Sequence, residues 1–378
     1  MKTAKRLCIL ILVMNMMLLS GCWNYHELED MSLVTGVAID KGINGDTYHL
    51  TFEFVDLTGD QIKSKLVESD GNTIYDCIRN VTGKGEKKLN FTECKVIIIS
   101  QDLAAQGISP ILDWYIRDHE PRMNLNLIIS KEKTANEILQ EKPITDELIS
   151  LEIWKALNRN VTTLGKVPCV ELYQAINMLS DNGISLILPT IRIEKFSTST
   201  ALVLDGTALF EGEKLFGYLD SEKTKYLLFI KNQIDGGLLL SDNDSGNLCL
   251  EVVESNTKLT PKIENNEPSV DIKIKMRAML SEDLSSTDHN SSDGIKKVER
   301  EAEKTLTNSI SDLIKSVQSQ TTSDIFGFGT LFYQNYPEYW KKEKLKWKEQ
   351  FPKLKCTVSA SIKIENTELL KQKIKVGG

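Results

Sequence analysis

The sequence predicts an α+β protein with three mixed α/β domains, the last carrying a long amphipathic helix and a second helix on a largely antiparallel sheet. Two observations predict this class. Segments with an apolar residue at every second position interleave with segments whose apolar residues recur every three or four positions. The 378 residues also exceed what one hydrophobic core normally holds. We expect a leader at 1–21, an N-terminal domain at 22–198, a small β-rich middle domain at 199–262 and a C-terminal domain at 263–378.

The first 21 residues have the layout of an export signal. Lys2, Lys5 and Arg6 form a basic head, and an apolar run of thirteen residues at 7–19 follows it, broken only by Asn15. Basic head, short apolar core and small residues before a cleavage point are the three parts of a secretory signal peptide. Because a helix needs about 20 apolar residues to cross a bilayer, no permanent span is expected here.

A cysteine stands at the end of this signal, directly after Leu19, Ser20 and Gly21. The tetrapeptide resembles the bacterial lipobox, in which the cysteine thiol takes a diacylglycerol and then becomes the first residue. An ordinary signal peptide followed by a chance cysteine is the alternative. We predict that Cys22 is a lipid attachment site and that the protein is a lipoprotein on the extracytoplasmic face of a membrane, where two acyl chains anchor it stably.

Composition and charge exclude several classes of protein. Loss of residues 1–21 changes the formal net charge from -7 to -10, so nucleic acid is not an expected partner. The sequence holds no phosphate-binding glycine loop, zinc-protease motif or nucleophile elbow, so we predict no enzyme activity, no cofactor and no metal. Five widely spaced cysteines follow Cys22 without a CxxC pair, which favours buried small side chains over a disulfide framework, although one bridge stays open.

Alternating strands and helices predict the N-terminal domain. Residues 31–40 and 48–55 predict a hairpin, which a polar connection at 61–71 follows. Pro189 lacks a backbone N–H, so the strand at 184–193 is expected at a sheet edge. The other expected elements are strands at 96–99 and 123–130 and helices at 73–81, 108–117, 134–140, 144–158 and 170–179.

A cluster of charged residues follows the helix expected at 108–117. It consists of Arg117, Asp118, Glu120 and Arg122. One interpretation is a contact site for a ligand or a neighbouring subunit. The commoner arrangement is a helix end at the surface whose charges pair with one another, each pair contributing about 0–1 kcal/mol.

Two polar segments mark the expected limits of the middle domain. Residues 196–201 form a Ser/Thr-rich bridge, and residues 264–268 form a second connection. Between them, 203–220 predicts two short strands joined by a turn. Apolar runs at 226–230, 236–240 and 247–253 complete a β-rich unit.

One long helix, a second helix and two strands predict the C-terminal domain. Seven apolar residues recur at steps of three or four between 295 and 317, which predicts an amphipathic helix about 35–40 Å long. A second helix is expected from Tyr336, with Trp340 and Trp347 facing inward. Alternating apolar residues predict strands at 270–278 and 354–364.

Five lysines lie close together between 341 and 348 in this acidic chain. They can be read as a face for anionic lipid headgroups, which attract each cation by about 1 kcal/mol near the surface. A solvated helix face without a partner is the commoner interpretation.

Three stretches of the sequence resemble one known family. In the first stretch, Cys22-Trp23 leads through acidic residues into a strand with Gly36 and Asp40. The second stretch, 205–217, contains Gly-x-Ala-x-Phe followed by Lys-Leu-x-Gly. The third stretch, 324–342, contains Asp-x-Phe-Gly-x-Gly, aromatic residues, a proline and Trp-Lys. These motifs resemble the C-subunit lipoproteins of spore germination receptors, the Ger(x)C family. The resemblance spans nearly all of residues 22–376. The family commonly has a histidine just before the buried strand, where this chain has Thr-Glu-Cys-Lys at 92–95.

The resemblance implies the C subunit of a nutrient germinant receptor, needed for germination of the spore. It implies a non-enzymatic protein, anchored through Cys22 at the outer face of the spore inner membrane, beside an integral-membrane A subunit and a transporter-like B subunit. Nutrient recognition would then lie chiefly in those partners, and no small-molecule ligand is expected here. An extracytoplasmic solute-binding lipoprotein of a transporter is the alternative, and it predicts two similar α/β lobes.

Overall fold

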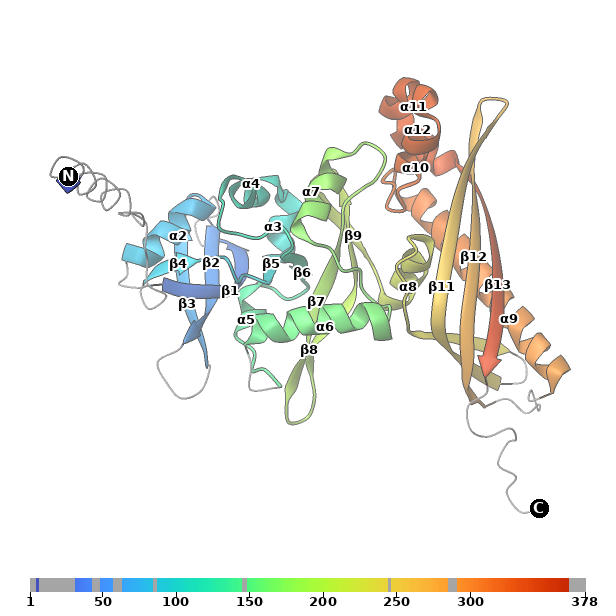
Figure 1. The fold of residues 1–378 in the computed structure, drawn as a ribbon, viewed down its shortest axis with the longest axis horizontal. Helices are drawn as coiled ribbons and strands as arrows, with labels where there is room; N and C mark the ends of the chain where they lie inside the picture. The colour runs from blue at the N-terminus through green and yellow to red at the C-terminus, as the bar shows by residue number, and fades with distance from the viewer. Residues whose placement is uncertain are drawn as a thin grey trace, which may run out of the picture.

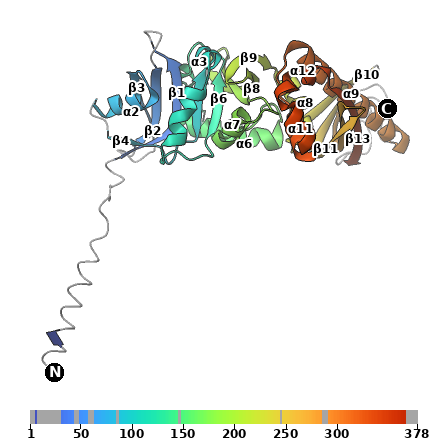
Figure 2. The same cartoon turned by 90° about the horizontal axis from the view of Figure 1, so that it is seen from above.

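The structure, a computed structural model, has two lobes that lie end to end along the long axis of the molecule (Figures 1 and 2). A nine-stranded mixed sheet forms the first lobe, and a four-stranded sheet forms the second. Each sheet carries its own helices, so the predicted α+β class is confirmed. The structure describes residues 5–6, 31–42, 48–56, 63–83, 87–144, 148–243, 246–284 and 291–366.

The sheet of the first lobe has a parallel centre and antiparallel flanks. Its strands are β1 (Met31–Lys41), β2 (Tyr48–Asp56), β3 (Lys63–Gly71), β4 (Lys88–Asn90), β5 (Val96–Ser100), β6 (Asn126–Ser130), β7 (Ile187–Lys195), β8 (Thr200–Glu211) and β9 (Lys214–Leu219). They run in the order β3-β2-β1-β5-β6-β7-β8-β9, and β4 also pairs with β1. Parallel pairing joins β1, β5, β6 and β7, whereas β3-β2-β1 and β7-β8-β9 are antiparallel.

Helices cover both faces of this sheet. The central strands β5 and β6 are buried at every position, as expected of parallel strands with two covered faces. This burial on both faces explains why the sequences of β5 and β6 are almost continuously apolar. One face packs on α2 (Ile74–Gly83), α3 (Gln101–Gln106), α4 (Ser109–Arg117) and α7 (Leu172–Ser180), and the other on α5 (Asn136–Leu139) and α6 (Ile149–Thr163).

Two expectations for this lobe are wrong. The expected polar connection at 61–71 contains β3, and its polar residues are tolerated because β3 is an edge strand. The strand around Pro189 lies between β6 and β8 instead of at an edge. Proline fits there because the register with β8 shifts between Pro189 and Ile191, and β6 pairs only with Thr190 and Ile191.

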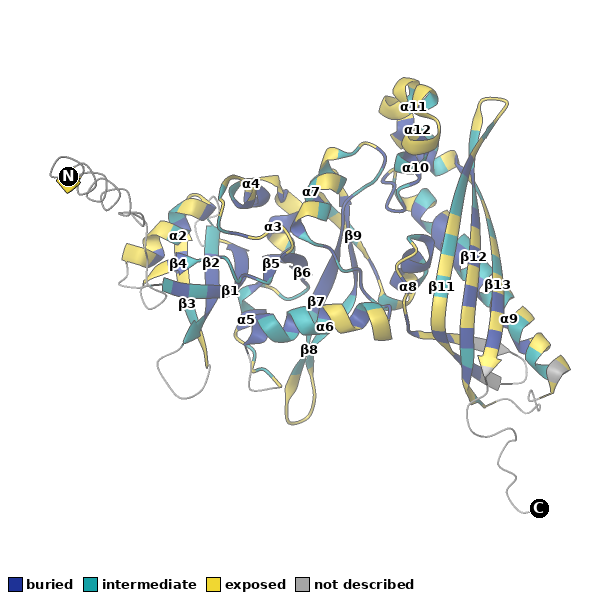
Figure 3. Ribbon diagram, viewed as in Figure 1, coloured by how far each residue is buried: buried dark blue, intermediate teal, exposed yellow. Residues whose placement is uncertain are grey.

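The second lobe has helices on one face of its sheet. Its strands are β10 (Leu238–Asn243), β11 (Gly246–Glu264), β12 (Glu267–Asp283) and β13 (Lys355–Asn366), and β12 pairs with β13 in parallel while the other pairs are antiparallel. Along β12, buried Ile272 and Ile274 alternate with exposed Lys273 and Lys275. Figure 3 shows this alternation of buried and exposed residues along the strands. The exposed face is therefore polar.

The long amphipathic helix predicted from the apolar repeat is α9 (Ser292–Gln320). Its apolar stripe packs on the sheet in the core of the second lobe. The carboxylates of Glu299 and Glu303 accept the backbone N–H groups of Ile364 and Ile362, at 2.9 and 3.0 Å. These amides lie on the outer edge of β13, so α9 protects part of that edge from pairing with another strand.

The apolar run at 226–230 is helical, which corrects the expectation of a strand. It belongs to α8 (Ser221–Ile230), which follows β9 and joins the two lobes. Asp220 caps this helix by accepting the N–H of Lys223 at 2.7 Å. Residues 227–230 are all buried, so the run has no exposed positions that would reveal a helical period.

The expected second helix after Tyr336 is divided into short pieces. They are α11 (Pro337–Glu343), η2 (Lys344–Lys346), α12 (Trp347–Gln350) and η3 (Phe351–Lys353), and α10 (Phe328–Asn335) precedes them. The backbone departs from helical values at Glu343 (φ −106°, ψ −10°) and Lys346 (φ −100°, ψ 2°), where the pieces meet. Trp340 and Trp347 are buried, as predicted.

The expected domain boundaries fall at hairpins. β7 and β8 pair Lys195 with Thr200 across the Ser/Thr-rich bridge, and β11 and β12 pair Glu264 with Glu267 across the second polar segment. Neither position lies between the two sheets. Polar residues of these types form hairpin turns as well as linkers, so composition alone did not distinguish a turn from a domain boundary. β8 and β9 belong to the first sheet, and β10 and β11 belong to the second. The division into three domains stays a prediction.

Candidate functional site

Of the two sites predicted from sequence, Cys22 lies outside the described residues, and its lipidation stays a prediction. The charged cluster is described and lies where α4 ends. Arg117 forms an ion pair with Asp113 of the same helix at 2.8 Å. Asp118 accepts the backbone N–H of Glu120 at 2.8 Å and so tightens the turn that follows the helix.

The other charges of this cluster pair with a residue of β4 and with a residue between β4 and β5. Glu120 pairs with Lys88 at 2.8 Å, and Arg122 pairs with Glu93 at 3.0 Å. The charged side chains therefore pair mainly with residues outside the cluster, in contrast to the mutual pairing that we considered. Exposed pairs of this kind contribute about 0–1 kcal/mol each. A role of the cluster in partner contact stays a prediction.

The signature segment that starts at Asp324 is organised around the buried carboxylate of that residue. One oxygen, Oδ1, accepts the backbone N–H groups of Phe326 and Gly327, at 3.1 and 2.9 Å. The other oxygen accepts the N–H of Gly329 at 2.8 Å and the indole Nε1–H of Trp347 at 3.0 Å. Gly327 has φ +82°, a left-handed conformation that glycine adopts without strain. Asp324 thus holds the start of α10 against α12.

Two glycines bring the backbones of the two lobes into direct contact. A Cβ built on Gly183, in the loop before β7, would lie 2.3 Å from the nitrogen of Thr330 and 2.5 Å from the carbonyl carbon of Gly329. A Cβ on Gly329 would lie 2.5 Å from the Cα of Gly183. No side chain fits at such distances, so this contact requires glycine at both positions.

Hydrogen bonds join the same two segments, which we call the interlobe seam (residues 181–185 with 324–330). The backbone N–H of Thr330 donates to the carbonyl of Gly183 at 3.1 Å, and its hydroxyl donates to Asp181 at 2.9 Å. The N–H of Ser185 donates to the carbonyl of Asp324 at 2.7 Å. The seam therefore fixes how the second lobe is oriented on the first.

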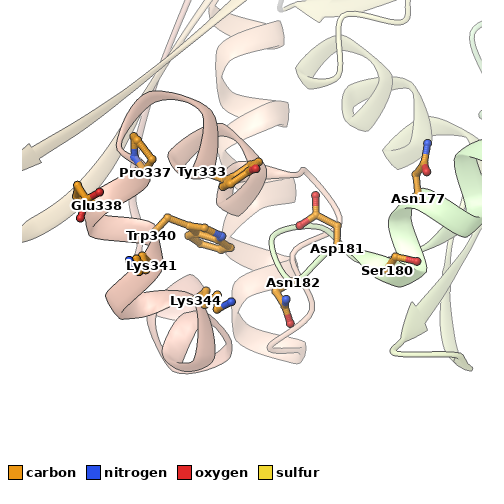
Figure 4. A pocket seen from close by; sticks show the side chains of 10 residues that line it. All are labelled: Asn177, Ser180, Asp181, Asn182, Tyr333, Pro337, Glu338, Trp340, Lys341 and Lys344. Atoms are coloured by element: carbon orange, nitrogen blue, oxygen red, sulfur yellow. The ribbon is translucent and has the colours of Figure 1, made fainter.

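A cavity of about 640 Å³ opens beside the interlobe seam (Figure 4). Residues of α7 and the loop after it form one wall, and residues of α10, α11 and η2 form the other. The lining combines aromatic rings with charges of both signs. Its size lies within the usual range of small-molecule sites, about 300–1,000 Å³. The lining residues are Asn177, Ser180, Asp181, Asn182, Tyr333, Pro337, Glu338, Trp340, Lys341 and Lys344.

Two titratable side chains near the seam, Asp324 and Cys356, contribute to packing and hydrogen bonding. Burial raises the pKa of Asp324, but its two oxygens already accept four hydrogen bonds and have no site left for a substrate. Burial raises the pKa of Cys356 to about 12, so this thiol stays protonated and unreactive at neutral pH. Across the described ranges, no group of His, Cys, Asp and Glu residues could hold a metal ion.

The sequence patterns did not predict that two buried carboxylates of the first lobe cap helices. Glu53 of β2 is fully buried and accepts the N–H groups of Ile149 and Ser150 at the start of α6, at 2.9 and 2.8 Å. Asp40 of β1 accepts two N–H groups at the start of α5 in the same way. These unpaired donors and the positive end of the helix dipole offset part of the cost of burying a carboxyl group there. The sequence signal that could have indicated these caps is an acidic residue inside an otherwise apolar strand of the hairpin expected at 31–40 and 48–55.

Comparison with known proteins places both halves of the chain in one family. The family model described as "Spore germination protein N-terminal domain" matches residues 24–193, and the one described as "Spore germination B3/ GerAC like, C-terminal" matches residues 205–368. Spore germination protein KC of Bacillus subtilis (strain 168) is 24% identical and the match covers 98% of each chain. Spore germination protein B3 of the same organism is 25% identical over 97% of this chain and 98% of its own length.

A solved structure has the same fold. The crystal structure of the GerBC protein matches with a TM-score of 0.58 at 22% sequence identity, over 88% of this chain and 97% of that chain. Both lobes are therefore found together in a relative. None of the helices in the described part of the chain is long and apolar enough to cross a bilayer.

Proposed function

Because the chain belongs to the Ger(x)C family of spore germination proteins, we propose that it is the lipid-anchored C subunit of a nutrient germinant receptor. The observation that carries this proposal is the match of both family models, which together reach from residue 24 to residue 368. Curated relatives of nearly the same length are named spore germination proteins, which supports the same role.

In this proposal the protein works beside two integral-membrane subunits, A and B, at the outer face of the spore inner membrane. A diacylglycerol on Cys22 holds it there and raises its local concentration near those partners. The role is non-enzymatic and consists of assembly and coupling. The interlobe seam supports it, since a subunit with two rigidly joined lobes presents a fixed surface to its neighbours.

Replacement of Cys22 tests the anchor and the assembly role together. We expect spores that carry Cys22→Ala to contain less assembled receptor and to germinate poorly with nutrient, because the protein lacks its membrane attachment. Cys169→Ala is the matched control, since this cysteine lies in the body of the first lobe, and it should germinate normally. Normal germination and normal receptor levels in the Cys22→Ala spores would contradict the proposal.

A solute-binding lipoprotein is the second candidate, and the cavity beside the seam favours it. That class predicts two similar lobes, whereas a nine-stranded and a four-stranded sheet differ in size, topology and helix cover. Titration calorimetry of the full chain with single amino acids and sugars separates the two candidates. Tight binding of one nutrient, lost in Trp340→Ala but kept in a control variant far from the cavity such as Lys258→Ala, would favour the solute-binding protein.

A further inference from the structure

A corner of the second lobe exposes an apolar residue among lysines. This lysine corner (residues 341–348) comprises the end of α11, η2 and the start of α12, which stand at one end of the second lobe in Figure 1. Leu345 lies in η2 and is 84% exposed, more than any other large apolar side chain among the described residues. Burial in the protein therefore does not explain a leucine at this position.

The lysine corner is held in shape from its inner side. Trp340 and Trp347 are buried with ring centroids 5.4 Å apart, and Trp347 also donates to Asp324. Glu343 accepts a hydrogen bond from the side chain of Gln350 at 2.7 Å. Because the tryptophans occupy the inner positions, the turn between them presents Leu345 outward on a fixed support.

The five lysines around this leucine are only partly paired with carboxylates of the protein. Lys346 lies 3.8 Å from Glu343, and Lys348 pairs with Glu211 at 3.5 Å. The other three, Lys341, Lys342 and Lys344, have no ion pair within the described part of the chain, and all three are exposed. Such a concentration of positive charge in a chain of net charge -7 attracts an anionic surface in one orientation.

We propose that the lysine corner docks on an anionic lipid bilayer, with Leu345 between the headgroups and the lysines beside the lipid phosphates. A bilayer accepts an isolated projecting leucine without a matching pocket, whereas a protein partner needs one. Lysines around an apolar tip combine the two forces that bind peripheral proteins to membranes. This docking goes beyond the proposed receptor role and depends neither on Cys22 nor on other subunits.

Vesicle flotation of the full chain tests the docking. The probes are vesicles of phosphatidylcholine alone and vesicles that also contain phosphatidylglycerol. We expect the wild type to favour the anionic vesicles and to lose this preference at high salt. The triple variant Lys341→Gln, Lys342→Gln and Lys344→Gln should bind the anionic vesicles on the order of 100-fold more weakly, with unchanged binding to neutral vesicles. The variants share the same amino-terminal segment, so the difference between them reports on the lysine corner.

Matched variants distinguish binding through the lysine corner from an effect of the total charge of the protein. Lys258→Gln, Lys273→Gln and Lys275→Gln remove the same charge from the open sheet face and should bind like the wild type. Replacing the three corner lysines with arginine should preserve binding, and Leu345→Ser should weaken it roughly tenfold. Equal binding of the wild type to both vesicle types, or equal losses in the two glutamine variants, would overturn the proposal.

Discussion

Replacing Gly183 with alanine adds one methyl group to the interlobe seam. The new Cβ would lie 2.3 Å from the backbone nitrogen of Thr330 and 2.5 Å from the carbonyl carbon of Gly329. These are backbone atoms, so they cannot turn aside as the end of a flexible side chain could. Overpacking costs about 1–3 kcal/mol, and loss of the 3.1 Å hydrogen bond from Thr330 to Gly183 costs about 1 kcal/mol more. We expect a total loss of about 2–4 kcal/mol.

This loss falls on the contact between the lobes. Scanning calorimetry of the full chain should show a melting temperature lower by roughly 3–5 °C. Small-angle X-ray scattering should show a larger radius of gyration, because the lobes no longer hold one orientation. Gly217→Ala in β9 is the control, since a Cβ there meets nothing within 4 Å. A Gly183→Ala protein with the melting temperature and scattering profile of the wild type would refute the idea that backbone contact locks the lobes.

Three further substitutions test the buried carboxylates. Asp324→Asn points an amide N–H₂ at donors such as the indole of Trp347. Urea unfolding should therefore show a free energy of unfolding lower by about 2–4 kcal/mol. An unchanged midpoint would contradict the role of Asp324. Glu53→Gln should cost about 1–3 kcal/mol and speed hydrogen exchange at the start of α6, because one of its two backbone bonds loses its acceptor; unchanged exchange would argue against capping. Burial raises the pKa of Asp40 above 3.8, so the folded protein keeps this proton to higher pH than the unfolded chain does. Its stabilising contribution is complete below pH 3.8 and is lost as pH rises through the folded-state pKa, so Asp40→Asn should lose less stability than the wild type over that range.

Local sequence patterns were sufficient where each element has one buried and one exposed face. The apolar repeat between 295 and 317 predicted α9, and alternation predicted β12 and β13. The same patterns failed for elements that are mostly exposed and for elements that are completely buried. β3 is a polar edge strand with little apolar signal, and the fully buried run at 227–230 has no exposed positions to mark it as helical.

Contacts between distant parts of the chain were beyond these patterns. Gly183 is an ordinary loop glycine in the sequence, whereas Gly329 belongs to the signature segment, and only the fold brings the two together. Glu53 likewise gains its function as a cap from α6, which lies far along the chain. The signature segment was identified as unusual from its residues, but its role as the joint between two lobes depends on packing that no local period encodes.

The central claim is that this protein is a receptor subunit that works through integral-membrane partners. Affinity purification of the tagged full chain from detergent-solubilised spores, followed by mass spectrometry of the eluted proteins, tests it most directly. We expect A and B receptor subunits to elute with the chain in comparable amounts. Recovery of the chain alone from spores that contain those subunits would contradict it.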